Sequence, residues 1–169
     1  MVKMSEESNH PINQKLEEAT HYILSKCSGK STFTKTVLFK LLYFSDFNFF
    51  KKNHKSITGE SYRKLDYGPA PSHFSEIIDS LVKSGKVKSM VNVEGVSRYK
   101  VLSSPEIKYL GDEEVDMINK VIEKVGHCTA TEISKLSHED TPWQVTGDKE
   151  IIEYNLVFYR DESVAKKLE

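Results

Sequence analysis

Residues 33–50 of the protein read FTKTVLFKLLYFSDFNFF, and this stretch decides how the rest of the chain must pack. Seven of these residues are aromatic. On a helix that turns about 100° per residue, the apolar side chains point to nearly every side. A helix that is apolar nearly all round is a buried helix, so we expect it at the centre of the core. Asp46 lies among the apolar positions and needs a polar partner to remain charged there.

The segment after this helix is polar and ends in Asp66-Tyr67-Gly68-Pro69-Ala70-Pro71. Pro71 restricts the residue before it to extended geometry, so the segment cannot be helical before its end. We expect a turn over residues 57–60, a short extended piece, and then a helix from Ser72, its N-cap, to about Ser84. The buried stripe predicted for that helix consists of Phe74, Ile77, Ile78, Leu81 and Val82.

Hydrophobic periodicity predicts two helices before that segment. The first begins at Pro11, after Asn9 as N-cap, and runs to about Cys27, where Gly29 in a left-handed conformation ends it. The second is the aromatic helix itself, over residues 34–53, with the hydroxyl of Thr32 or Thr34 accepting from its first amides.

The second half of the chain begins with a predicted β-hairpin. Residues 86–93 and 96–102 alternate between apolar and polar as strands do, with a left-handed Gly95 in the turn between them. Helices are predicted over 112–125 and, after the capping-box spacing of Thr129 and Glu132, over 129–136. A loop over 137–143 follows, and residues 151–159 fit either a strand or a helix, of which we expect the helix. The predicted fold class is therefore α+β and mainly α-helical, with a buried aromatic central helix and a flanking β-hairpin.

The composition is that of an ordinary globular domain, with 169 residues, 29% charged and 38% hydrophobic. We predict one domain over residues 11–160, with 1–10 as a disordered lead and 161–169 as a frayed tail. No apolar run reaches the roughly 18 residues of a membrane span, and the polar first residues lack a secretion-signal pattern. Two scattered cysteines make no disulfide framework. We therefore expect a cytoplasmic protein that does not bind membranes.

Charge is distributed unevenly along the chain. Residues 1–100 carry a net charge of +6, and residues 101–169 carry −7. Either the two halves pair with each other, or the protein presents a basic face to an acidic partner and an acidic face to a basic one. Internal pairing is the simpler arrangement.

The sequence contains no pattern that calls for catalysis. Gly29-Lys30-Ser31-Thr32 resembles part of a phosphate-binding loop, but Leu24 stands where the second glycine is needed, and a helix precedes it instead of a strand. The six histidines show no metal-ligand spacing. Asp46, Asp66 and His73 are conceivable as an acid–base set, although a buried Asp that is satisfied by neighbouring donors is commoner. We expect no enzymatic activity, no metal and no cofactor.

DNA binding is the second function that the order of elements suggests. The aromatic helix, the helix over 72–84 and the hairpin follow one another as in a winged helix. The predicted hairpin is mostly basic and includes Lys88 and Arg98, whereas the helix that would enter the groove exposes Glu76 and Asp79. Acidic side chains at those positions would oppose the phosphates. A winged-helix-like transcriptional regulator therefore stands as the alternative.

Several short motifs along the chain resemble the Panacea domain, the SocA-like antitoxin family that is also labelled phage-associated GepA-like proteins. The motifs are Lys40-Leu41-Leu42-Tyr43-Phe44-Ser45-Asp46, Ile57-Thr58-Gly59-Glu60, Tyr67-Gly68-Pro69, Leu136-Ser137-His138 and Trp143. Each is short, but their order and spacing match over most of the chain. One departure is Ala70-Pro71, where an aliphatic residue is expected.

The resemblance implies a non-enzymatic antitoxin, encoded beside a toxin gene in bacteria, archaea or prophages. Such a protein neutralises its cognate toxin by direct binding, or by binding followed by delivery to a protease. We predict a partner-binding surface around residues 64–73 and the hairpin, with Asp46 bracing the Tyr67-Gly68-Pro69 loop from inside. The predicted contact residues are Lys64, Asp66, Tyr67, Pro69, His73, Lys88 and Arg98, and the predicted supporting residues are Tyr43, Asp46, Gly68 and Trp143.

Overall fold

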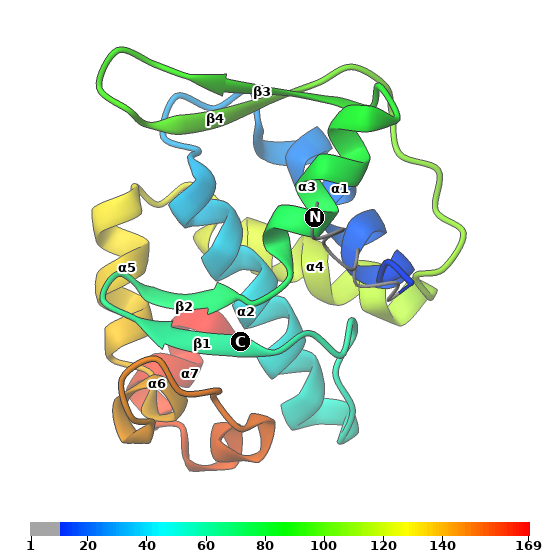
Figure 1. Ribbon diagram of the computed structural model, residues 1–169. Helices are drawn as coiled ribbons and strands as arrows, with labels where there is room; N and C mark the ends of the chain where they lie inside the picture. Colours follow the sequence, from blue (N-terminus) through cyan, green and yellow to red (C-terminus); the bar gives the residue numbers. More distant parts are fainter. Residues whose placement is uncertain (1–10) are drawn as a thin grey trace, which may run out of the picture.

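The computed structural model describes residues 11–169 and shows an α+β fold that is mainly helical, as the sequence predicts (Figure 1). The predicted disordered lead and the predicted cap Asn9 lie outside the described residues. The elements in chain order are α1 (Gln14–Cys27), α2 (Lys35–Asn53), β1 (Tyr62–Leu65), β2 (Gly68–Pro71), α3 (Phe74–Lys83), β3 (Val87–Val91), β4 (Ser97–Val101), α4 (Asp112–Val125), α5 (Ala130–His138), α6 (Thr141–Val145), the 3-10 helix η1 (Tyr154–Tyr159) and α7 (Glu162–Leu168).

Helix α2 is the buried centre of the fold. Every residue from Val37 to Phe49 except Phe39 is buried, which confirms the expectation from the aromatic stretch. The helix packs against α1, α4, α5, η1 and both hairpins, so neighbours cover it on all sides. It ends at His54, whose left-handed backbone (φ 59°) closes the last turn. The aromatic composition of α2 thus forces the surrounding elements to wrap around it.

The ends of α1 and the start of α2 differ from the prediction. Helix α1 begins at Gln14 because the side chain of Asn13 accepts a hydrogen bond from the amide of Leu16 (3.0 Å). Gly29 does not adopt the predicted left-handed conformation, and Ser28 caps the helix with a right-handed backbone. Thr34 is the N-cap residue of α2, but its buried hydroxyl makes no capping hydrogen bond. Here the backbone, and not the threonine side chain, sets the start of α2.

Two antiparallel hairpins lie on the helices (Figure 1). The β3–β4 hairpin matches the predicted alternation, although its strands are shorter, and Gly95 is left-handed in its turn (φ 79°). The β1–β2 hairpin was predicted only as a short extended piece, and it gains a third segment along β1. The amide of Lys64 donates to Glu150 O (3.0 Å), and the amide of Ile152 donates to Tyr62 O (2.8 Å). The predicted helix over 151–159 therefore starts as an extended segment and becomes a 3-10 helix only at Tyr154.

Helix α3 starts one residue later than predicted, with His73 and not Ser72 as its N-cap residue, and it buries a narrower stripe. The amide of Ser72 donates to Ser61 O (2.9 Å), which continues the pairing of the hairpin and leaves His73 as the N-cap residue. Phe74, Ile77 and Leu81 are buried, whereas Ile78 is half-buried and Val82 is 40% exposed. The pairing of β1 with β2 thus sets where α3 can begin.

The last third of the chain is more ordered than the sequence suggests. Helix α4 and the capping box of α5 at Thr129 and Glu132 agree with the prediction. The predicted loop over 137–143 contains the start of α6, and the predicted frayed tail over 161–169 is helix α7. Val164 and Leu168 of α7 are buried, and the side chain of Asn48 donates to Leu168 O (3.0 Å). Burial of these two apolar residues against the core holds the tail in place.

Candidate functional site

The turn of the β1–β2 hairpin presents a large aromatic side chain to solvent. Asp66 and Tyr67 form the turn between the paired residues Leu65 and Gly68, and Tyr67 is 77% exposed. Gly68 has a left-handed backbone (φ 113°) that a side chain rarely adopts. A Cβ at this position would overlap Ser137 Oγ and lie 2.6 Å from Lys40 Cε. The turn therefore sits directly on α2 and α5 because residue 68 has no side chain.

Trp143 supports the other strand of the same turn. Its indole Nε1 donates to Leu65 O (3.3 Å), and the ammonium of Lys64 lies 4.1 Å from the centroid of its ring. The ring of His138 stacks on the indole with centroids 4.3 Å apart. A cation over an indole face and a stacked aromatic pair each favour this arrangement. The hairpin turn is thus held from below at both of its ends.

Asp46 is fully buried and binds the turn before β1. Its carboxylate accepts from the amide and hydroxyl of Thr58 (2.8 and 2.6 Å) and from the hydroxyl of Tyr62 (2.6 Å). Burial raises the pKa of Asp46 to about 6, while the hydrogen bonds from Thr58 and Tyr62 oppose that rise. The prediction that Asp46 braces the Tyr67-Gly68-Pro69 loop is therefore corrected. Asp46 holds the residue 57–60 turn and the start of β1, because the donors that surround it come from that segment.

Tyr43 belongs to a different buried network. Its hydroxyl donates to Asp140 Oδ2 (2.9 Å), and the guanidinium of Arg160 binds both oxygens of the same carboxylate (2.8 and 3.0 Å). Arg160 also donates to the Asn48 side chain (2.6 Å). Asp140 and Arg160 were not predicted from the sequence. The two residues lie 20 positions apart and meet only in the folded protein, so no local sequence pattern indicates the pair. Through this network Tyr43 fastens the segment around Arg160 to α2, and its hydroxyl bonds to Asp140 and not to the predicted loop.

The predicted contact residues divide into an accessible group and others. Asp66, Tyr67 and His73 are exposed, and Lys64 is half-buried. Pro69 is buried, so its side chain is not accessible to a partner, which corrects its prediction as a contact residue. The His73 ring pairs with the buried Glu60 (2.6 Å), and this hydrogen bond raises the pKa of His73.

The two other predicted contact residues lie on the other hairpin. In Figure 1 the β3–β4 hairpin runs along the top of the molecule, away from the β1–β2 turn. Lys88 is exposed there, whereas Arg98 Nη1 donates to Phe33 O (2.9 Å) and so fastens β4 to the start of α2. The exposed side of α3 carries Glu76 and Asp79, whose charges oppose nucleic-acid phosphates. The structure therefore does not join the two hairpins into one surface.

A family model described as "Antitoxin SocA-like, Panacea domain" matches residues 38–144. The chain belongs to the SocA-like, Panacea-domain antitoxin family. No curated protein and no solved structure matches it. Family membership supports an antitoxin-type role and a protein partner such as a toxin.

The motifs that carry the resemblance to the Panacea domain meet around the β1–β2 hairpin. Lys40 and Ser137 lie under Gly68, Trp143 lies under Leu65, and Asp46 binds the residue 57–60 turn. These residues come from α2, α5, α6 and the hairpin itself. Lys40 was not predicted as a site residue. The sequence does carry a signal for it, because Lys40 and Asp46 are the charged residues within the buried part of α2. The family motifs thus build the support of one exposed turn.

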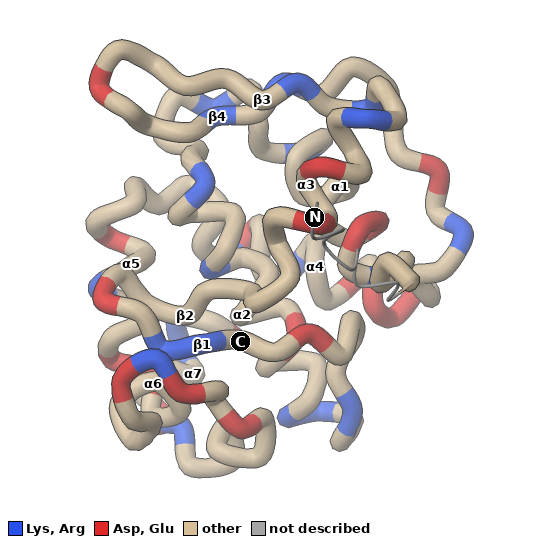
Figure 2. The backbone as a smooth tube through the Cα atoms, viewed as in Figure 1, with Lys and Arg blue, Asp and Glu red and all other residues tan. Residues whose placement is uncertain are grey.

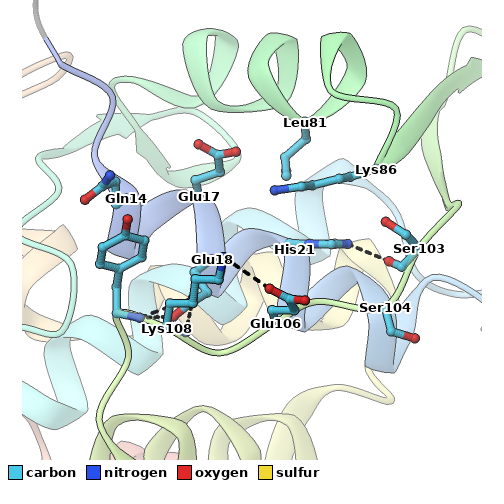
Figure 3. A pocket seen from close by; sticks show the side chains of 11 residues that line it. Gln14, Glu17, Glu18, His21, Leu81, Lys86, Ser103, Ser104, Glu106 and Lys108 are labelled. Atoms are coloured by element: carbon cyan, nitrogen blue, oxygen red, sulfur yellow. Dashed lines mark hydrogen bonds and ion pairs between the residues drawn. The ribbon is translucent and has the colours of Figure 1, made fainter.

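A cavity lies elsewhere, between α1, α3 and the segment 103–109 (Figure 3). It has a volume of about 580 Å³. Both carboxylate oxygens of Glu18 accept hydrogen bonds from the consecutive amides of Lys108, Tyr109 and Leu110 (2.6–3.3 Å). His21 Nε2 lies 2.8 Å from Ser103 O. These bonds fasten the segment to α1, so we assign them a structural role.

Residues 11–169 contain no group of three His, Cys, Asp or Glu side chains placed to hold a metal ion. Within the same range, no helix has the length and apolarity needed to cross a membrane.

Proposed function

We propose that this Panacea-domain protein neutralises a cognate toxin by binding it directly through the β1–β2 turn. The observation that supports this proposal is Tyr67, which is 77% exposed on a turn held from below by α2, α5 and Trp143. Tyrosine is enriched among the residues that dominate protein–protein binding energy. A turn that is already held in place loses less conformational entropy when a partner binds.

The residues next to Tyr67 suit the edge of a protein interface. Leu65 is 43% exposed and adds apolar area, while Asp66 and Lys64 supply opposite charges at its border. Figure 2 shows basic positions on β1 beside acidic positions in the neighbouring loops. A small apolar centre with a mixed polar border is typical of a specific protein contact.

The test is co-expression with the protein encoded by the neighbouring gene, followed by a binding measurement on the purified pair. Tyr67→Ala should weaken binding by a factor on the order of 30 and reduce the rescue of growth, with an unchanged melting temperature. The matched control is Tyr159→Ala, because Tyr159 is 73% exposed but lies on η1. The control should bind and rescue as the unmodified protein does.

Two results would contradict the proposal. The first is a neighbouring gene product that is harmless when expressed alone, or that stays toxic in the presence of this protein. The second is equal binding by Tyr67→Ala and Tyr159→Ala. Delivery of the toxin to a protease would follow the same binding step. An immunoblot of the toxin in co-expressing cells separates the two routes, because delivery removes the toxin and simple blocking leaves its amount unchanged.

A further inference from the structure

Lys40 is a largely buried charge whose ammonium has no protein partner within residues 11–169 and touches solvent only at its tip. Its side chain is 2% exposed in the middle of α2, and burial alone lowers its pKa to about 8. Among residues 11–169, no hydrogen bond and no ion pair to its ammonium is found. The other buried charges are satisfied, as Asp46 by Thr58 and Tyr62, and Arg160 by Asp140. Lys40 therefore differs from every other charge in this core that the preceding sections describe.

The ammonium lies under the turn that we propose to be the binding site. A Cβ on Gly68 would be 3.2 Å from Lys40 Nζ, so only the backbone of a glycine separates the ammonium from the turn. Gly68 pairs with Leu65, and Asp66 and Tyr67 lie between them. On the neighbouring helix, His138 Nε2 is also buried without a hydrogen-bond partner. An ammonium without an ionic partner and a buried imidazole nitrogen without a hydrogen bond therefore lie on the two helices that support this turn.

An ammonium that has lost most of its hydration and has no ionic partner is unfavourable, and a neutral side chain of similar length would fill the space at a lower cost in free energy. The charge becomes favourable if a carboxylate reaches it. We propose that Lys40 forms an ion pair with an Asp or Glu side chain of the bound partner protein, inserted beside the β1–β2 turn. This inference rests on the proposed function and names the chemistry of the contact. The exposed Asp66 in the same turn opposes a polyanion, and Leu65 and Tyr67 fit a protein surface.

Lys40→Met tests the pair because it removes the charge and keeps an unbranched apolar chain. We expect Lys40→Met to melt at the same temperature as the unmodified protein or higher, since it removes a buried charge. Its affinity for the purified product of the neighbouring gene should fall by a factor on the order of 30 or more. The matched control is Lys52→Met, an exposed lysine on the same helix, which should leave both properties unchanged.

Proton uptake gives a second measurement that a purely structural lysine would not change. Pairing with a carboxylate raises the pKa of Lys40, so at pH 8 the complex should take up about half a proton as it forms. Calorimetry in buffers of different ionisation enthalpy measures this uptake, and Lys40→Met should abolish it. If Lys40→Met is destabilised, or if it binds as tightly as the unmodified protein, the proposed role of Lys40 is overturned and the proposed function is not. Failure of the unmodified protein to bind the neighbouring gene product overturns the proposed function and this inference together.

Discussion

The two hairpins have the same antiparallel topology but opposite surroundings. All four residues of β2 are buried, and Tyr62 of β1 is fully buried against α2. In β3 only Val87 is buried, and Val93 in the following turn is completely exposed. The β1–β2 hairpin is therefore part of the core, whereas the β3–β4 hairpin touches the core mainly through Val87 and Tyr99.

This difference shows that an exposed side chain on a hairpin is not necessarily held in place by contacts beneath it. Both hairpins expose large side chains, but only the β1–β2 turn exposes one above a layer of specific contacts. A two-stranded ribbon is marginally stable by itself, so its order depends on what lies beneath it. We therefore locate the binding surface on the hairpin with the buried underside, and the following predictions test that contrast.

The largest expected effect concerns the side chains that brace each hairpin. Asp46→Ala leaves three donors without an acceptor: the buried hydroxyl of Tyr62 and the partly buried amide and hydroxyl of Thr58. We expect it to lower the free energy of unfolding by about 4 kcal/mol. Arg98→Met, which removes one partly buried bond from the β3–β4 hairpin, should lower it by only about 1 kcal/mol. Urea denaturation of both variants measures the difference, and similar losses would mean that the two hairpins are equally braced.

The elements that were predicted correctly carry their signal locally. The aromatic residues of α2 leave it no exposed side, and the alternation from Val87 to Val101 needs no distant partner to indicate a hairpin. The strand Gly68–Pro71 was missed because Gly and Pro are poor strand residues. Its pairing depends on α2 beneath it, which no local pattern reports. Helix α7 was missed for a similar reason, since only Val164 and Leu168 of a charged segment are buried.

The next prediction compares two left-handed glycines. Gly68→Ala adds a methyl group that meets Lys40 and Ser137 at an unfavourable φ of 113°, so we expect a loss of about 3 kcal/mol in the free energy of unfolding. Gly95→Ala has an unfavourable φ of 79° but no atom within 4 Å of the added group. It should lose about 1 kcal/mol. Thermal denaturation monitored by circular dichroism distinguishes the two variants. If Gly68→Ala is as stable as Gly95→Ala, the turn does not pack tightly on α2 and α5.

The candidate site was predictable only in part. Asp46 is found because an acid among aromatic residues demands a partner, but the partner Thr58 lies 12 residues further along the chain and no spacing rule identifies it. The Tyr43–Asp140 contact spans 97 residues, so it depends on the complete fold. The exposed Tyr67 was found through its motif, whereas the burial of the neighbouring Pro69 follows from the pairing of β2. Local chemistry thus indicates which residues matter, and tertiary packing decides what they contact.

The smallest expected effect is a pH dependence that belongs to the buried hairpin alone. The pKa of Asp46 is about 6 in the folded protein, above its ordinary value of 3.8, because burial disfavours the charge. The folded state therefore binds the proton more tightly, and the stabilisation is complete below about pH 4 and lost as the pH rises through 6. Relative to Asp46→Asn, the unmodified protein should lose roughly 2 kcal/mol between about pH 4 and pH 7.

Urea denaturation across this pH range checks the prediction, with Glu94→Gln in the exposed turn of the β3–β4 hairpin as the control. The Glu94 side chain faces water in the folded and the unfolded state, so its curve should run parallel to that of the unmodified protein. Parallel curves for Asp46→Asn and the unmodified protein would instead mean that Thr58 and Tyr62 fully offset the burial of the Asp46 charge. In that case the Asp46 charge beneath the β1–β2 hairpin would cost no stability, and Lys40, which has no ionic partner within residues 11–169, would remain the charge whose pKa is shifted by burial alone.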